Sequence, residues 1–300
     1  MVTDTVVAVP NQGWDERILV CRYGPLVDTF IIVTQRYVVI IDTLINRATA
    51  EALLVIARPY LGSRQLLVVN THADWDHAWG NHVFAGSAAT SPAPIIASRK
   101  CAERLRADAS RQKLADKRAQ SPGRHDDVVL TPPTVLFDER LVIDGGDLSL
   151  ELFATPGHTA DHIAVFLPEI STLLPGDAAE LPFPFVESAA AMPQMRASLA
   201  QLAALQAKTV LYCHAPVTSG SALLQQNMAY FDKLEQRCQT ALQRGPCALD
   251  GDIEAIVGFR FAEALPPDAD AAALEGFYRP GHHRAIRAML QHLLAVANTG

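Results

Sequence analysis

The chain has 300 residues, of which 49% are hydrophobic and 19% charged, so it can bury a core and does not fit the disordered or fibrous classes. Its 25 basic and 32 acidic residues leave a net charge of −7, which argues against a mainly electrostatic nucleic-acid partner. A membrane-spanning helix needs roughly 18 apolar residues, and Gln35 and Arg36 interrupt the longest apolar run. We therefore expect a soluble protein with neither a nucleic-acid nor a membrane partner.

The N-terminal stretch and the cysteines bear on the compartment. Asp4 stands where a secretory signal would carry Lys or Arg, and the apolar stretch after it is short. The 5 cysteines are odd in number and form no C-x-x-C pair, which is untypical of a disulfide framework. We expect a cytoplasmic protein, and the sequence does not determine its oligomeric state.

Strands and helices alternate along the chain. Residues 28–42 predict two strands around Gln35 and Arg36, residues 48–61 a helix, and residues 66–69 a strand covered on both faces. A charged helix is expected at 98–119, followed by short strands at 134–137, 141–143, 148–153, 163–167 and 172–174. Helical spacing returns at 193–207 and 222–244, with a strand at 209–212 between them and a last helix at 282–297. This order predicts an α/β fold, a four-layer αββα sandwich with a C-terminal helical extension.

Metal-ligating side chains follow four of the predicted strands at their C-terminal ends. The strand at 66–69 runs into THADWDH, and later strands run into TPGH, PGD and a Cys-His pair. Loops at strand ends converge, so these side chains are expected to lie together. The seven candidate ligands are His72, Asp74, Asp76, His77, His158, Asp177 and His214. Any one of them alone would more simply cap a turn, but the whole set predicts a site for two metal ions.

This set of ligands resembles the metallo-β-lactamase superfamily, whose signature H-x-H-x-D-H is followed by a His, a bridging Asp and a final His. The resemblance covers about residues 25–220, and TPGHTADHIAV is similar to the hydrolase branch that includes glyoxalase II. It implies a catalytic domain of the metallo-β-lactamase fold at residues 1–220, with residues 221–300 as a helical extension packed on the same domain.

The resemblance also implies how the ligands divide and what they do. His72, Asp74 and His158 would hold one metal, Asp76, His77 and His214 the second, and Asp177 would bridge the two. Two divalent ions lower the pKa of a bound water from about 15.7 towards about 7, which supplies a nucleophile at neutral pH. The implied protein is a hydrolase that cleaves an ester, thioester, lactone or related acyl bond with a metal-bridging hydroxide.

In this interpretation Asp76 has a second role, and three further residues have one each. Asp76 is expected to orient the nucleophile or carry a proton to the leaving group. His162, four residues after His158, is equally compatible with a catalytic substrate contact and with an ordinary strand-end histidine. Asp42 and Thr71 are expected to steady the ligand imidazoles.

Asp74 departs from the resembled motif, which has His at this position. Exchanging imidazole for carboxylate lowers the charge of the centre by one, so bound water should be less acidic and the first site should favour harder ions. We expect zinc, with iron or manganese as alternatives, because zinc tolerates carboxylate ligands. A carboxylate here also resembles the flavodiiron branch, so a di-iron oxidoreductase is the alternative function, and a metal-binding non-catalytic module is a second alternative.

The segment from Arg99 to Arg124 holds nine basic and three acidic residues. A solvated helix face and a contact surface for an anionic substrate are both compatible with it. We expect a small-molecule substrate, with an anionic one as an open alternative. Elsewhere, His82 and His125 are expected at the surface. A loop that starts the last helix is expected to carry Phe277, Tyr278, His282 and His283, which are compatible with a helix start and with substrate contacts alike.

Overall fold

A computed structural model describes residues 5–245, 247, 251–267 and 269–299. The first four residues lie outside this range, and they include Asp4, on which the expectation of a cytoplasmic protein partly rests. The chain divides into two compact units, Met1–Ala154 with Asp161–Gly176, and Thr155–Ala160 with Asp177–Gly300. Among the described residues, no helix combines the length and the apolar character needed to cross a membrane.

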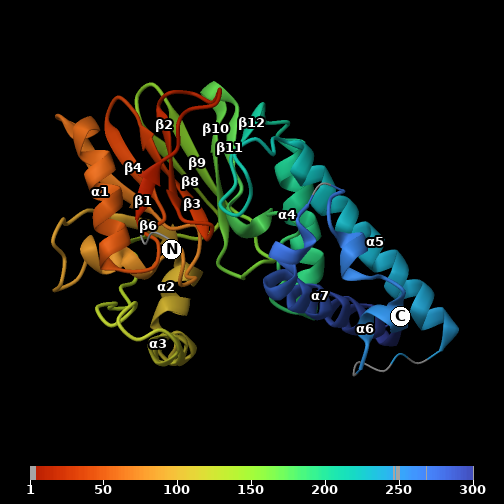
Figure 1. The fold of residues 1–300 in the computed structure, drawn as a ribbon. Helices are drawn as coiled ribbons and strands as arrows, with labels where there is room; N and C mark the ends of the chain where they lie inside the picture. The colour runs from red at the N-terminus through yellow and green to blue at the C-terminus, as the bar shows by residue number, and fades with distance from the viewer. Residues whose placement is uncertain (1–4, 246, 248–250, 268, 300) are drawn as a thin grey trace. The chain divides into compact units, whose positions relative to one another are not determined.

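The first unit contains a seven-stranded sheet whose strands are neighbours in chain order (Figure 1). Its strands are β1 (Val6–Ala8), β2 (Ile18–Tyr23), β3 (Val27–Val33), β4 (Tyr37–Ile41), β5 (Gln65–Val69), β6 (Ile95–Ser98) and β7 (Val135–Phe137). Strands β1 to β4 pair antiparallel, and β4 to β7 pair parallel. The end of β5 is fully buried at Val68 and Val69, as its continuous apolar run predicts for a strand covered on both faces.

Helices connect the parallel strands of this sheet. These are α1 (Arg47–Leu61), the short 3₁₀ helix η1 (Trp79–Val83), α2 (Arg99–Arg106) and α3 (Asp108–Gln120). Helix α1 begins at a reciprocal cap, in which the Asn46 side chain accepts from the Thr49 N–H and the Thr49 side chain accepts from the Asn46 N–H. The single charged helix expected at 98–119 is two helices, because Ala107 takes an extended backbone between α2 and α3.

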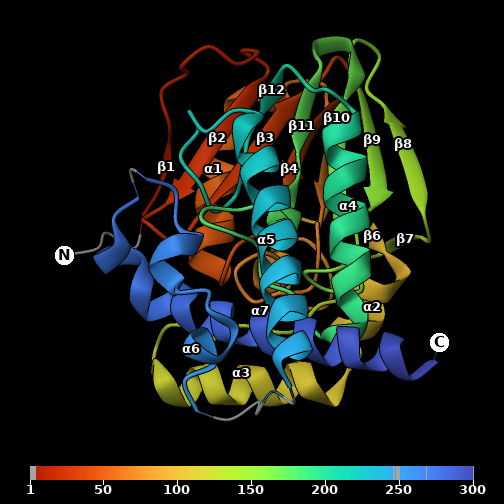
Figure 2. The same cartoon turned by 90° about the vertical axis from the view of Figure 1, so that its right-hand side faces the viewer.

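The second sheet of this unit contains an antiparallel meander of β8 (Arg140–Asp144), β9 (Ser149–Ala154), β10 (Ile163–Leu167) and β11 (Thr172–Leu174). It lies beside the first sheet in both views (Figures 1 and 2). A Cβ atom on Gly145, in the β8–β9 turn, would lie 2.6 Å from Cβ of Thr34. The turn can therefore approach the β3–β4 hairpin only because position 145 is glycine.

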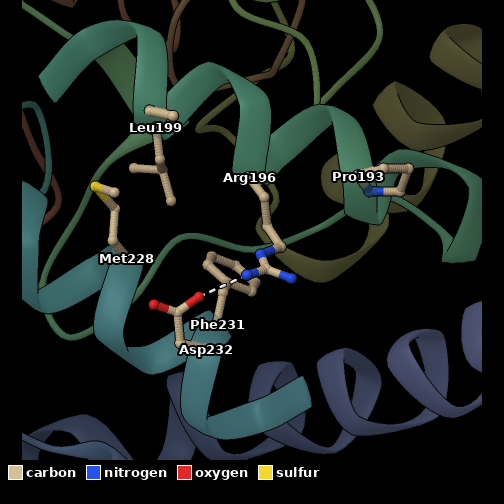
Figure 3. Close-up of a pocket in the computed structure, with 7 residues that line it drawn as sticks. Pro193, Arg196, Leu199, Met228, Phe231 and Asp232 are labelled. Carbon is tan, nitrogen blue, oxygen red and sulfur yellow. Dashed lines mark hydrogen bonds and ion pairs between the residues drawn. The ribbon is translucent and has the colours of Figure 1, made fainter. Parts of the chain in front are cut away.

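The second unit is mainly helical. It contains α4 (Met192–Ala204), α5 (Ala222–Arg244), α6 (Ile253–Val257), α7 (Ala271–Thr299) and the short strand β12 (Thr209–Val210). Short 3₁₀ helices are η2 (Pro168–Ile170) in the first unit, η3 (Gly176–Ala178) where the units join in sequence, and η4 (Ala189–Ala191) and η5 (Phe261–Ala264) in the second. Helices α4 and α5 lie side by side (Figure 2). A groove of about 380 Å³ lies between them, and the ion pair of Arg196 with Asp232 borders it (Figure 3).

Helix α7 begins at Ala271, eleven residues earlier than expected, so the segment with Phe277 and Tyr278 is helical and not a loop. Pro280 favours a helix boundary because it lacks an N–H donor, but it lies inside the helix. A Cβ atom on Gly281 would lie 2.0 Å from the Phe185 ring, so the glycine lets that ring sit against the helix.

The two sheets, with seven α-helices in the described residues, confirm the α/β class and the C-terminal helical region.

Candidate metal centre

The first set of candidate ligands lies in the loop between β5 and η1. His72 and His77 are completely buried, Asp76 is buried, and Asp74 is half-buried. The N–H groups of His77 and Ala78 donate to the Asp74 carbonyl at 3.0 and 2.9 Å, which makes a tight turn of this segment. The turn gathers all four polar side chains at the C-terminal end of a buried parallel strand.

Asp42, which follows the neighbouring strand β4, orients two of these side chains. Its Oδ1 atom accepts from the Thr71 N–H at 2.7 Å, and its Oδ2 atom accepts from the Thr71 hydroxyl at 2.7 Å. Nδ1 of His77 lies 2.8 Å from Oδ2 of Asp42, and Nδ1 of His72 lies 3.0 Å from the Thr71 hydroxyl. These contacts fix the direction of both Nε2 atoms, as the partners of metal-binding histidines do.

The Nε2 atoms face carboxylates at distances that suit shared metal coordination. Nε2 of His72 lies 3.7 Å from Oδ2 of Asp74, and Nε2 of His77 lies 4.0 Å from Oδ1 of Asp76. Two ligand atoms at about 2.1 Å from a tetrahedral ion are about 3.4 Å apart. These pairs are therefore too far apart for hydrogen bonds but close to the spacing of two ligands on one ion.

The second set of candidate ligands lies in the second unit. His158 is in the segment after β9, Asp177 is in η3, and His214 follows β12. Oδ2 of Asp177 lies 3.6 Å from Nε2 of His158 and 3.4 Å from Nε2 of His214. One carboxylate oxygen thus faces two imidazoles, which is the arrangement that a bridging aspartate needs.

Backbone features hold this second set in place. Gly157, next to His158, has a φ of +141°, and a Cβ atom there would lie 2.4 Å from Cα of Met195 on α4. Only glycine allows the segment to pass this close to the helix. The Leu181 N–H donates to the His214 carbonyl at 3.0 Å, which ties the loop after Asp177 to the loop that carries His214.

The donor atoms of the two sets fit a divalent metal. Imidazole nitrogens and carboxylate oxygens are ligands of zinc, iron and manganese. The His and Asp side chains are of the types that could hold metal ions. All three metals accept these donor types.

His162 lies beside the first set of ligands. It is buried, and the centroid of its ring lies 5.1 Å from that of His72. A Cβ atom on Gly176 would lie 2.6 Å from Nε2 of His162, so the glycine makes room for the imidazole. This packing is compatible with a substrate contact and with a structural role alike.

Sequence reasoning missed the cations that contact Asp74. Oδ1 of Asp74 lies 2.8 Å from the Arg104 guanidinium and 3.2 Å from Nζ of Lys113. The second guanidinium nitrogen of Arg104 lies 3.1 Å from Oδ1 of Asp161. Some basic residues of this segment therefore contact the candidate ligand Asp74. Others do not, since Arg111 pairs with Asp108 at the surface. The excess of positive charge in residues 99–124 was the only signal in the sequence, and it did not distinguish Arg104 and Lys113 from the other basic residues.

A second residue that the sequence did not single out is Glu180, which is buried in the second unit. Its carboxylate accepts from the Tyr278 hydroxyl at 2.8 Å and from the Phe185 N–H at 3.2 Å. Burial raises the pKa of Glu180 to about 7, although the nearby His214 opposes this shift. Its place three residues after Asp177 was a signal for a role near the site. The contact also gives Tyr278 a defined partner.

Two histidines expected at the surface are buried, so that expectation was wrong. His82 lies in η1 with Nδ1 3.0 Å from the Trp79 carbonyl, and His125 contacts the rings of Trp75 and Trp79 edge-on. Burial lowers the pKa of both imidazoles, which keeps them neutral. Both are therefore structural residues of the first unit.

The chain matches one protein-family model and several solved structures. The family model of the metallo-beta-lactamase superfamily matches residues 22–214. A metallo-beta-lactamase family protein of Thermus thermophilus has a similar structure, with a TM-score of 0.62, 20% identity, and coverage of 97% of this chain and 93% of that one. A metallo-beta-lactamase from Pontibacter korlensis has a TM-score of 0.56 and 19% identity over 76% of this chain and 99% of its own.

A third similar structure is a double mutant of the sec-alkyl sulfatase PisA1. It has a TM-score of 0.65 and 19% identity, and the match covers 94% of this chain but 50% of the sulfatase. A comparison with curated protein sequences gives no match. At these identities the similar structures support the fold alone.

Proposed function

Because the chain belongs to the metallo-β-lactamase superfamily, whose members are mostly metal-dependent hydrolases, we propose that it hydrolyses an ester, thioester, lactone or related acyl bond. The observation that carries this proposal is the spacing of imidazole nitrogens and carboxylate oxygens, which face each other at 3.4 to 4.0 Å within each ligand set. Such spacing suits side chains that bind an ion together.

The proposed ligands are those that the motif implies. His72, Asp74 and His158 hold one ion, Asp76, His77 and His214 hold the other, and Asp177 contributes to both. Support for the bridging role is that one oxygen of Asp177 faces the Nε2 atoms of both His158 and His214. Zinc is the proposed metal, with iron and manganese as alternatives.

When bound, two divalent ions supply Lewis acidity, which brings the pKa of a coordinated water towards about 7 and polarises an acyl carbonyl. The side chains of this chain orient the reactants. Asp76 accepts a proton from the attacking water and returns it to the leaving group, and His162 contacts the substrate. Asp42 and Thr71 keep the ligand rings in place.

The proposed substrate is a small molecule with an anionic group. Lys113 and Lys117 lie one turn apart on α3, where Lys113 contacts Asp74 and Nζ of Lys117 lies 3.7 Å from the centre of the Trp75 ring. Both cations are therefore close to the loop that carries His72 to His77. This placement favours the substrate-contact interpretation of the basic segment over a purely solvated helix face.

Two further parts of the proposal concern the organisation of the chain and its compartment. Residues 1–220 act as the catalytic domain, and residues 221–300 form a helical extension. The proposed compartment is the cytoplasm, supported by the cysteines, all of which lie in described residues and none of which is in a disulfide.

The proposal is tested by measuring metal content and hydrolysis together. Protein purified without added metal is assayed for bound metals and for turnover of ester, thioester and lactone substrates. Two divalent ions per chain and turnover that disappears in the His158→Ala and Asp177→Asn variants would support it. His292→Ala, on α7 and outside both ligand sets, is the control and should behave as wild type.

Three results would contradict the proposal. His158→Ala with wild-type turnover would show that the ligand set is wrong. About two irons per chain with redox activity and no hydrolysis would instead support the di-iron oxidoreductase. Metal binding without any turnover would support a non-catalytic module.

A further inference from the structure

The guanidinium of Arg104 lies between two carboxylates of the first unit. One nitrogen is 2.8 Å from Oδ1 of Asp74, and the other is 3.1 Å from Oδ1 of Asp161. The other oxygen of Asp74, Oδ2, faces Nε2 of His72 at 3.7 Å. The two oxygens of Asp74 thus have different partners: Oδ1 contacts Arg104 and, more distantly, Lys113, whereas Oδ2 faces the proposed ligand His72.

Several contacts hold Arg104 and Asp161 in place. Oδ2 of Asp161 accepts from the Ala73 N–H, between the two proposed ligands His72 and Asp74, at 2.8 Å. The hydroxyl of Ser98 donates to the Asp161 carbonyl at 2.8 Å and also caps α2 by accepting from the Cys101 N–H. Helix α2, which carries Arg104, is therefore fixed to the same residue that binds the ligand loop.

Asp161 compensates the charge of Arg104, and Lys113 is a further cation on Oδ1 of Asp74. The side chain of Asp161 is only 1% exposed, and its negative charge offsets that of the guanidinium. An uncompensated positive charge beside the site would repel the metal ions. Arg104 can restrain Asp74 without this cost, because Asp161 compensates its charge. The planar fork of arginine can contact both carboxylates at once, whereas the single ammonium of lysine cannot hold the same geometry.

We propose that Arg104 is a positioning residue for the first metal, and that it lets an aspartate act where the family motif has histidine. Arg104 holds Oδ1 of Asp74 so that Oδ2 points at the ion. Aspartate is shorter than histidine, and its carboxylate can rotate about the Cβ–Cγ bond. A contact from another side chain is therefore needed to fix the direction of Oδ2. This inference rests on the proposed function only in taking Asp74 as a metal ligand.

The test measures zinc affinity by competition with a chromophoric chelator, using metal-stripped protein. Arg104→Gln should weaken the binding of one of the two ions by about 10- to 100-fold, the range found when the partner of a ligand is removed. Arg104→Lys should lie between this variant and wild type. Arg99→Gln is the matched control, because it removes an ion pair with Asp138 from the same helix but no contact with a ligand.

The Asp74→His background provides the sharper test. Histidine at that position offers no carboxylate to Arg104, so adding Arg104→Gln there should not lower zinc affinity. The same substitution should lower affinity in the wild-type background. Equal losses in both backgrounds would mean that Arg104 acts on the fold and not through Asp74, which would overturn the proposal.

The remaining outcomes separate this inference from the proposed function. If the wild type binds two zinc ions and loses one in His158→Ala, but Arg104→Gln binds both as tightly as wild type, only the inference is wrong. If the wild type binds no zinc, the proposed function fails first. The Tm of metal-stripped protein shows whether Arg104→Gln folds. If it does not, the double variant Arg104→Gln/Asp161→Asn is tested in the same way, because it also removes the buried charge of Asp161 that Arg104→Gln leaves unpaired.

Discussion

Asp42 and His77 are 35 residues apart in the chain, yet Oδ2 of Asp42 lies 2.8 Å from Nδ1 of His77. Asp42 has a φ of +61°, a left-handed conformation that Asp adopts more readily than most residues. From this position its carboxylate also accepts both the N–H and the hydroxyl of Thr71. One strained residue after β4 therefore organises the loop after β5.

The first prediction concerns this contact. Asp42→Asn should weaken zinc binding by about 10- to 100-fold, because an amide is a weaker acceptor and does not raise the basicity of the His77 ring. Competition with a chelator measures the affinity. Asp28→Asn is the control, since Asp28 is equally buried but pairs with Arg22 away from the ligands. Equal affinity in Asp42→Asn and wild type would show that Asp42 does not act on metal binding through His77.

The second prediction concerns the acidity of the centre. Asp74→His should raise its net charge by one, increase the preference for zinc over manganese or iron, and move the acidic limb of the kcat/KM profile to lower pH. Hydrolysis should persist. The measurements are metal content after growth in mixed metals and the pH profile of both proteins. An unchanged limb together with an unchanged metal preference would exclude Asp74 as a ligand.

The third prediction concerns an anionic substrate. Its kcat/KM should fall as ionic strength rises, because the Debye length shrinks from about 10 Å at 0.1 M to about 3 Å at 1 M. Lys117→Gln should reduce both kcat/KM and its salt dependence. Arg111→Gln, which removes an exposed pair with Asp108 on the same helix, should leave both unchanged. If kcat/KM depends on ionic strength in the same way in Lys117→Gln and wild type, the basic segment is better interpreted as a solvated helix face.

The fourth prediction concerns acid stability. Glu254 is buried, which alone would raise its pKa, but hydrogen bonds from the Phe261 N–H, His283 and Arg279 together lower the pKa to about 2. A carboxylate with a lowered pKa stabilises the fold above its unfolded value of 4.5 and loses this contribution as the pH falls towards 2.

Glu254→Gln should therefore reduce the free energy of unfolding at pH 7 and flatten its decline between pH 5 and pH 2. Denaturant titrations across this range measure the effect. Glu275→Gln is the control, because Glu275 pairs with the same Arg279 but is exposed. A decline as steep in Glu254→Gln as in wild type would contradict the prediction.

The sequence predicted those features that depend on local order. The apolar run 66–69 and the motif after it place His72 and His77 at a strand end, and the contacts of Asp42 and Thr71 with their rings follow the prediction. No spacing rule connects Asp74 with Arg104 or Asp161, because their contact depends on how α2 packs. The start of α7 was also missed, because Pro280 favours a helix boundary and yet lies inside the helix.

Trp75 stands between Asp74 and Asp76 in the chain, with Nζ of Lys117 3.7 Å from the centre of its ring and the ring of His125 edge-on at 5.9 Å. The emission of an indole depends on the charges around it, and Trp75 lies between two of the proposed ligands in the chain. If those ligands bind an ion, the fluorescence of Trp75 should therefore change on metal uptake. Replacing Trp14 and Trp79, which are the other two tryptophans, by phenylalanine would isolate its fluorescence and allow loading to be followed without any substrate.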